Sequence, residues 1–171
     1  MAPFGSIGAV LLAQAAKTGD TGWQGVALGK IAMAAAICAV FAVVVSGVMQ
    51  AGIFHKFQRL TPSTWRPEGP RQYLFGSAAR ALCGVIFPFL YIYTGMPRGI
   101  TFAGDSSLWI IAGLKFGLLA WGAVSLPQTL STGTFVNLHR GFVLGLALDW
   151  LLICLGCALV CTKVLTVTVA K

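Results

Sequence analysis

The sequence predicts an all-α integral membrane protein in which four transmembrane helices form one bundle, preceded by a short N-terminal interfacial segment. Of its 171 residues, 57% are hydrophobic and 9% are charged, whereas roughly 45 to 50% of a globular domain is apolar. Four apolar stretches, at 31–54, 73–95, 107–126 and 142–162, are each near the ~20 residues that cross a bilayer as a helix. The connections are short, so we expect residues 1–171 to form a single transmembrane domain with no separate soluble domain.

The first element, residues 1–16, contains a short apolar run that ends in Gln14, Ala15 and Ala16. This ending is similar to that of a signal peptide, but no positive residue precedes the run. We therefore expect an interfacial or partner-docking segment here, without a cleavable leader.

Proline and glycine mark the ends of the four spans. Three prolines fall within residues 60–71, after the first span, and proline cannot continue a regular helix. A Met-Pro-Arg-Gly sequence at 96–99 ends the second span. Pro127, with Gly133, is predicted to mark the third turn.

The distribution of basic residues predicts the orientation in the membrane. An even number of spans places both termini and loop 96–106 on one side, and loops 55–72 and 127–140 on the other. The latter loops carry more basic residues than loop 96–106, where Arg98 is the one basic residue. If Lys17, Lys30, Lys163 and Lys171 near the termini are counted, both sides carry the same number of basic residues. Lys30 and Lys163 are discounted because their side chains can snorkel. By the positive-inside rule, loops 55–72 and 127–140 face the cytoplasm or matrix, in a bacterial or organellar inner membrane. Their basic residues are Lys56, Arg59, Arg66, Arg71 and Arg140.

The formal net charge of +8 suggests that the basic loops bind a negatively charged partner. The twelve Lys and Arg residues are scattered and do not form one basic stripe, which argues against nucleic acid. We expect loop 55–72 to lie on the membrane surface, where it would bind anionic phospholipids or an acidic subunit.

Three charged residues, Arg80, Lys115 and Asp149, fall well inside apolar spans. An unpaired charge there costs at least ~2.5 to 3.5 kcal/mol, so each needs a partner. Arg80 follows Arg71 by nine residues and Asp149 follows Arg140 by nine, which places both about 13 Å along helices that start from the same side. The sequence therefore predicts an ion pair between Arg80 and Asp149.

Glycines share the helix faces of these two charges. They occur at a spacing of four, which places them on one face, and small residues allow close helix approach. We therefore expect spans two and four to touch along these faces. The glycines are Gly76 and Gly84 around Arg80, and Gly141 and Gly145 before Asp149.

Lys115 is a second intramembrane cation for which the sequence offers no further deep carboxylate. It is predicted to lie near the centre of span three, beside the helix-packing glycines Gly113 and Gly117. Its partner would be Asp149, a lipid phosphate, a bound anion or an acidic side chain of another subunit. The alternative is that its long side chain snorkels to the nearer interface.

Cofactor and catalytic motifs are sparse. His55 and His139 fall on the same side, followed by Lys56 and Arg140, so a bis-histidine haem that uses the basic residues for its propionates is one interpretation. Both histidines lie at loop boundaries, however, and we favour interfacial hydrogen bonding. The five cysteines fall in apolar stretches and are interpreted as packing residues, although three share a face of span four. We expect no metal site, no cofactor besides bound lipid, and no catalysis by this chain alone.

Residues 117–127, 137–140 and 147–150 resemble uncharacterised small four-span integral membrane proteins of bacteria. The resemblance covers roughly the second half of the chain and consists of tryptophans, a proline and an aspartate in the last span. That family has no established activity, so the resemblance implies none.

Three functional hypotheses follow. The favoured one is an accessory subunit of a larger energy-coupling membrane complex, of respiratory or photosynthetic type, that packs against other transmembrane subunits. A small transporter or channel is the second, but the chain lacks the inverted repeat and paired broken helices of secondary transporters. The third is an electron-transfer subunit that binds haem b or quinone.

Overall fold

The computed structural model describes residues 26–64, 69–94 and 108–165, and these residues form the predicted all-α fold. Four helices in this part of the chain are long and apolar enough to cross a membrane: Leu28–Gln58, Pro70–Tyr93, Trp109–Phe135 and Arg140–Val164. The predicted N-terminal segment, Arg66, Arg98, Lys17 and Lys171 lie outside the described residues.

The first span is built from three helical segments in succession. Helix α2 (Leu28–Ser46) continues into a π-helical segment (Gly47–Phe54) and then into the short helix α3 (His55–Gln58). A single 3₁₀ turn, Pro62–Thr64, follows α3. The second span is the uninterrupted helix α4 (Pro70–Tyr93), which begins at a proline because the first helical position needs no N–H donor.

The third span is longer than the sequence predicted. Helix α5 (Leu108–Ala120) passes through a π-helical segment (Trp121–Ser125) into α6 (Leu126–Phe135). The prediction that Pro127 marks the turn is therefore wrong. Proline lacks the N–H that an α-helix would bond, and the change of hydrogen-bond register in the preceding π segment lets the chain continue in helical form. The turn comes at residues 136–139, before α7 (Arg140–Val164).

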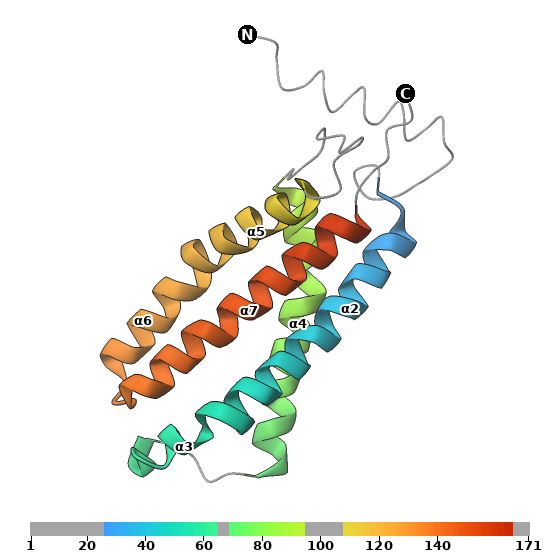
Figure 1. Cartoon of the computed structure of the whole chain (residues 1–171). Coiled ribbons are helices and arrows are strands. Elements are labelled where there is room, and N and C mark those ends of the chain that lie inside the picture. Colours follow the sequence, from blue (N-terminus) through green and yellow to red (C-terminus); the bar gives the residue numbers. More distant parts are fainter. Residues whose placement is uncertain (1–25, 65–68, 95–107, 166–171) are drawn as a thin grey trace, which may run out of the picture.

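Helix α7 lies at the centre of the bundle. It runs between α2 on one side and the α5–α6 span on the other, with α4 behind (Figure 1). The buried core joins small residues of α2 to residues of α7, which lets two backbones approach closely. These core residues include Ala34, Cys38 and Ala42 of α2, and Ile153, Cys157, Ala158 and Cys161 of α7.

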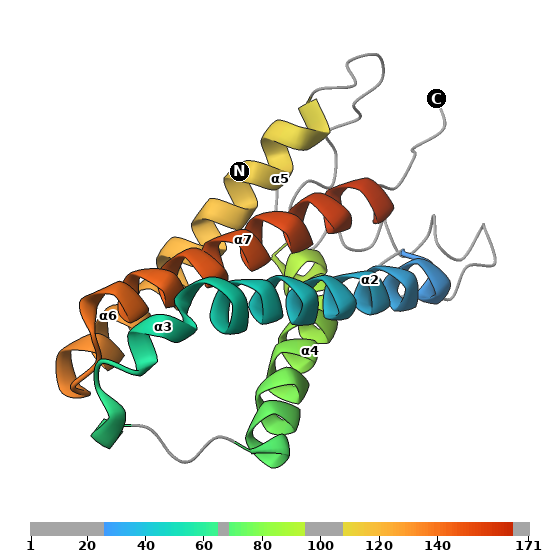
Figure 2. The same ribbon diagram turned by 60° about the horizontal axis from the view of Figure 1, so that its bottom comes forward.

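Helix α4 belongs to the bundle along its second half and leaves it along its first half. Phe87 and Tyr91 pack edge-to-face on Phe116 of α5, with ring centroids 5.8 and 5.0 Å apart. From residue 70 to residue 79, in contrast, every side chain is exposed. Figure 2 shows this half of α4 diverging from the other helices.

The glycines pack in a different way from the one predicted. A Cβ added at Gly84 would lie 2.5 Å from backbone atoms of Cys38 and Ala39, so this glycine seats α4 on α2 and not on α7. A Cβ at Gly76 would meet nothing within 4 Å, and Gly141 and Gly145 accommodate phenylalanines of the first span. Spans two and four are therefore not joined along matching glycine faces, and the prediction is wrong on this point.

Gly113 and Gly117 do act as helix-packing residues, between α5 and α7. A Cβ at Gly113 would lie 2.9 Å from the Leu159 side chain, and one at Gly117 would lie 2.8 Å from the Leu155 Cα atom. Both glycines are buried, so the two backbones meet closely along this contact.

Candidate functional site

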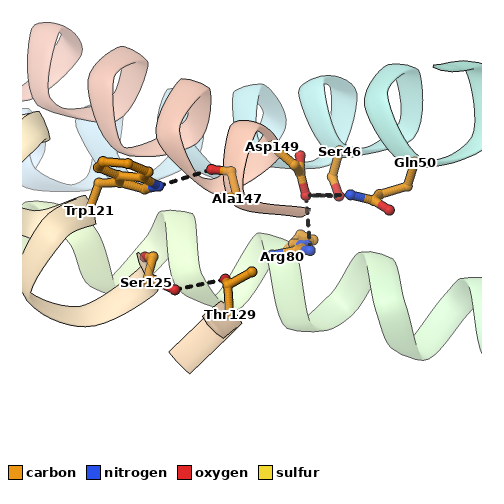
Figure 3. Close-up of polar contacts among 8 residues, drawn as sticks. All are labelled: Ser46, Gln50, Arg80, Trp121, Ser125, Thr129, Ala147 and Asp149. Carbon is orange, nitrogen blue, oxygen red and sulfur yellow. Dashed lines mark hydrogen bonds and ion pairs between the residues drawn. The ribbon is translucent and has the colours of Figure 1, made fainter. Parts of the chain in front are cut away.

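A polar cluster centred on Asp149 lies inside the bundle. The Asp149 side chain is 0% exposed, and its Oδ2 atom is 2.9 Å from Arg80 Nη2, so the ion pair predicted from equal helix depths is present. The same oxygen accepts hydrogen bonds from Ser46 Oγ at 3.1 Å and Gln50 Nε2 at 3.3 Å. Figure 3 shows these contacts, in which α2, α4 and α7 each provide at least one side chain.

The Arg80 guanidinium is held from a second direction as well. Its Cζ atom lies 4.0 Å from the centroid of the Trp150 ring, in cation–π geometry. The Arg80 side chain keeps 16% of its surface exposed, because the neighbouring first half of α4 stands away from the bundle. The cation is therefore buried at its charged contact, and part of the Arg80 side chain lies at the surface of the molecule.

Ser46 and Gln50 were not identified from the sequence. They are four residues apart, which places both side chains on the face of the first span that meets α7. Ser46 ends α2, and Gln50 lies in the π-helical segment that follows. One signal was available: they are the one hydroxyl and the one amide side chain in residues 31–54.

Three buried polar atoms of the cluster have no hydrogen-bond partner among the described residues. They are Gln50 Oε1, Arg80 Nη1 and Asp149 Oδ1. Three donors converge on Asp149 Oδ2, while the other oxygen of the same carboxylate receives none. The ion pair is therefore singly bonded and not the bidentate arrangement that Arg and Asp can form.

A second π-helical segment contacts α7 near the cluster. Trp121, its first residue, donates from Nε1 to the backbone oxygen of Ala147 at 2.9 Å (Figure 3). Ser125, its last residue, lies 3.8 Å from the Cys154 sulfur. In α6, the Thr129 hydroxyl donates a hydrogen bond to the Ser125 backbone oxygen at 2.7 Å.

Lys115 is an exposed residue of α5. The prediction that Lys115 lies near the centre of its span is wrong, because the span continues to Phe135 and Lys115 falls in its first third. Asp149, the one acidic residue among those described, pairs with Arg80 and not with Lys115. Because this position is closer to one end of the span than its centre is, the Lys115 side chain can reach the membrane interface more easily. This favours snorkelling over an internal partner.

The two histidines lie at the end of the bundle where α3 and the start of α7 meet (Figure 1). His139 Nδ1 accepts a hydrogen bond from the Gly141 backbone at 3.1 Å and so caps α7. Its ring stacks on Phe57, with centroids 5.1 Å apart. These contacts give His139 a role in helix capping, and haem ligation by His55 and His139 stays a prediction.

The cysteines are free thiols inside the bundle. Cys38 and Cys157 face each other across α2 and α7, and each sulfur contacts the other residue's carbonyl oxygen, at 3.7 and 3.8 Å. Within the described part of the chain, no group of three His, Cys, Asp or Glu residues could hold a metal ion. The sulfurs contribute to helix packing here.

The described basic residues that the sequence analysis assigned to loops 55–72 and 127–140 gather at one end of the molecule. All four are exposed, in or next to α3 and at the starts of α4 and α7, which lie at the lower end in Figure 1. They are Lys56, Arg59, Arg71 and Arg140. At the opposite end, Lys163 Nζ lies 5.1 Å from the centroid of the Trp109 ring.

Comparisons with protein-family models, curated proteins and solved structures found no match.

Proposed function

We propose that this protein is an accessory subunit of a larger membrane complex, and that the first half of α4 packs against a transmembrane helix of a neighbouring subunit. The observation that carries the proposal is the exposure of every residue from 70 to 79 in a helix that is otherwise built into the bundle. Small helical subunits are abundant in energy-coupling complexes, which makes the respiratory or photosynthetic type the first class to examine.

The composition of the exposed segment favours a helix over lipid as its neighbour. Residues 76–79 are Gly, Ser, Ala and Ala, and a Cβ at Gly76 would meet no atom within 4 Å. Small residues make little contact with lipid chains but allow another helix backbone to approach closely, and such packing drives helix association in membranes. Tyr73, Leu74 and Phe75 are also exposed and would supply apolar contact area.

A matched pair of glycine variants tests the proposal. Gly76→Leu fills open space on the proposed surface, whereas Gly122→Leu fills open space on the third span. We expect Gly76→Leu to lower the mass of the complex isolated from native membranes in mild detergent, and Gly122→Leu to leave it unchanged. Unfolding measurements on both variants show whether each is folded. A monomeric mass for the folded wild-type protein would contradict the proposal.

Photocrosslinking locates the contact independently. A photoreactive residue in place of Leu74, which is 69% exposed, should give discrete adducts with another membrane protein. The same residue in place of Val40, which is 65% exposed on α2, should give lipid adducts. Equal lipid adducts at both positions would argue against a helix neighbour at α4.

The Asp149 cluster favours a second candidate, a small transporter. Intramembrane ionisable side chains frequently mark substrate or proton pathways, and the Arg80 side chain is 16% exposed. Reconstitution of the purified monomer in proteoliposomes separates the two functions. Substrate or proton flux that Asp149→Asn abolishes would support transport, and a complex without flux by the chain alone would support the accessory subunit.

A further inference from the structure

His139 begins α7 with a hydrogen bond that exists in one protonation state of its ring only. The residue has extended backbone angles at the N-cap position, and its Nδ1 atom accepts from the Gly141 N–H at 3.1 Å. Because a backbone amide can only donate, Nδ1 is unprotonated and the proton of the neutral ring lies on Nε2. The cap of α7 therefore requires a neutral imidazole.

Protonation of the His139 ring removes this cap. Both nitrogens of an imidazolium are donors, so no rotation of the ring places an acceptor opposite the Gly141 N–H. The cation would also lie at the positive end of the α7 dipole. Histidine is the side chain that ordinarily changes its charge between about pH 5 and 8. Asparagine, which caps helices through an uncharged amide oxygen, does not titrate in this range.

The charged groups around the His139 ring would not compensate its positive charge. Lys56 Nζ lies 5.2 Å from the centroid of Phe57, the ring on which His139 stacks. Helix α6, which leads into the turn before α7, contains no charged residue. The one acidic residue in the described part of the chain, Asp149, is paired with Arg80 inside the bundle. The titratable or charged residues of α3, its C-cap and the start of α7 are all basic, namely His55, Lys56, Arg59 and Arg140.

The capped segment is also the part of α7 that holds α3. The rings of His139 and Phe57 are stacked, with an interplanar angle of 7°. A Cβ added at Gly141 would lie 2.8 Å from the Phe57 ring, so the amide capped by His139 belongs to the residue that accommodates this phenylalanine. A change in the cap therefore acts on the contact between α3 and α7. Thr64 Oγ1 donates to the Asn137 backbone oxygen at 2.8 Å, a separate link that keeps the change local.

We propose that His139 is a pH-sensitive switch at the junction of α3 and α7. With a neutral ring, α7 is capped and Phe57 is held between His139 and Gly141. With a protonated ring, the cap is lost and this contact loosens. Because the capped state binds one proton fewer than the uncapped state, it is favoured at high pH and is lost as the pH falls. The switch does not depend on the proposed function.

Amide hydrogen exchange of Gly141 tests the switch, followed by NMR on the protein in lipid nanodiscs at about pH 8 and about pH 5. Protection of this amide is compared after correction for the intrinsic pH dependence of exchange. In the wild type it should be about fivefold lower at the acidic pH, the factor by which an N-cap typically stabilises a helix end. In His139→Asn, which keeps an uncharged acceptor, the protection should be equal at both pH values.

His55→Asn is the matched control, because it removes the other histidine of the junction and leaves the cap of α7 intact. This variant should show the same loss of Gly141 protection at acidic pH as the wild type. The proposal is overturned by equal protection at both pH values in the wild type, by a loss that persists in His139→Asn, or by a loss that disappears in His55→Asn.

Discussion

Replacing Asp149 with alanine should strand the Arg80 cation and destabilise the bundle. Removing one partner of a buried ion pair costs about 3–5 kcal/mol, because the remaining charge is left uncompensated. Arg80 keeps 16% exposure and stacks on Trp150 at 4.0 Å, so without Asp149 it can turn towards the surface and keep one favourable contact. We therefore expect the low end of the range, about 3 kcal/mol.

A double-mutant cycle separates the ion pair from other effects of the substitution. Arg80→Met combined with Asp149→Ala should cost less than Asp149→Ala alone, since the double variant contains no stranded charge. The free energy of unfolding, measured in mixed micelles by titration with a denaturing detergent, gives each corner of the cycle. We expect a coupling free energy of about 1 kcal/mol or more.

Arg71→Met is the matched control, because Arg71 lies on the same helix and is exposed. Combined with Asp149→Ala, it should give effects that add to within about 0.5 kcal/mol, as distant sites do. If the effects of Arg80→Met and Asp149→Ala on the free energy of unfolding also add, the two side chains do not stabilise each other and the reasoning is refuted.

Further substitutions test packing, hydrogen bonding and surface charge. Gly84→Ala should lower the free energy of unfolding by about 1–3 kcal/mol, because the new methyl group meets the backbone of α2, whereas Gly76→Ala on the same helix should be tolerated. Trp121→Phe removes the hydrogen bond to α7 and should cost about 0.6 kcal/mol, so a gain in stability would contradict its role. Replacing Lys56 and Arg59 with glutamine should reduce the anionic lipid that copurifies with the protein, as should added salt, and unchanged lipid content would contradict surface binding.

The four spans and the ion pair were predictable because each follows from a strong local rule. A length of about 20 apolar residues defines a span, and equal distances from two basic helix starts placed Arg80 and Asp149 at one level. A charge in lipid has few ways to be satisfied, so two opposite charges at one depth make a specific prediction.

The helix partners of the glycines were less predictable. A small-residue face shows that close approach is possible, but any neighbouring helix can use it. Gly84 packs on α2, while Phe54 and Phe57, further along the first span, occupy the face of α7 at Gly145 and Gly141. The extent of the third span was missed for a related reason. The rule that proline ends a helix assumes α-helical hydrogen bonding, and the π-helical segment before Pro127 departs from it.

The ion pair lies where α4 leaves the bundle. Beyond Arg80, one face of α4 is buried, with Gly84, Phe87 and Tyr91 packed on α2 and α5, whereas all residues from 70 to 79 are exposed. Arg80 is thus the first residue of α4 that is not exposed, and it contacts α7 through the ion pair with Asp149 and the ring of Trp150. Its ion pair with Asp149 therefore ties the stability of the bundle to the position of the surface proposed to receive a partner helix. Loss of the pair should disturb partner binding through the orientation of α4, without any change in the residues that would touch the partner.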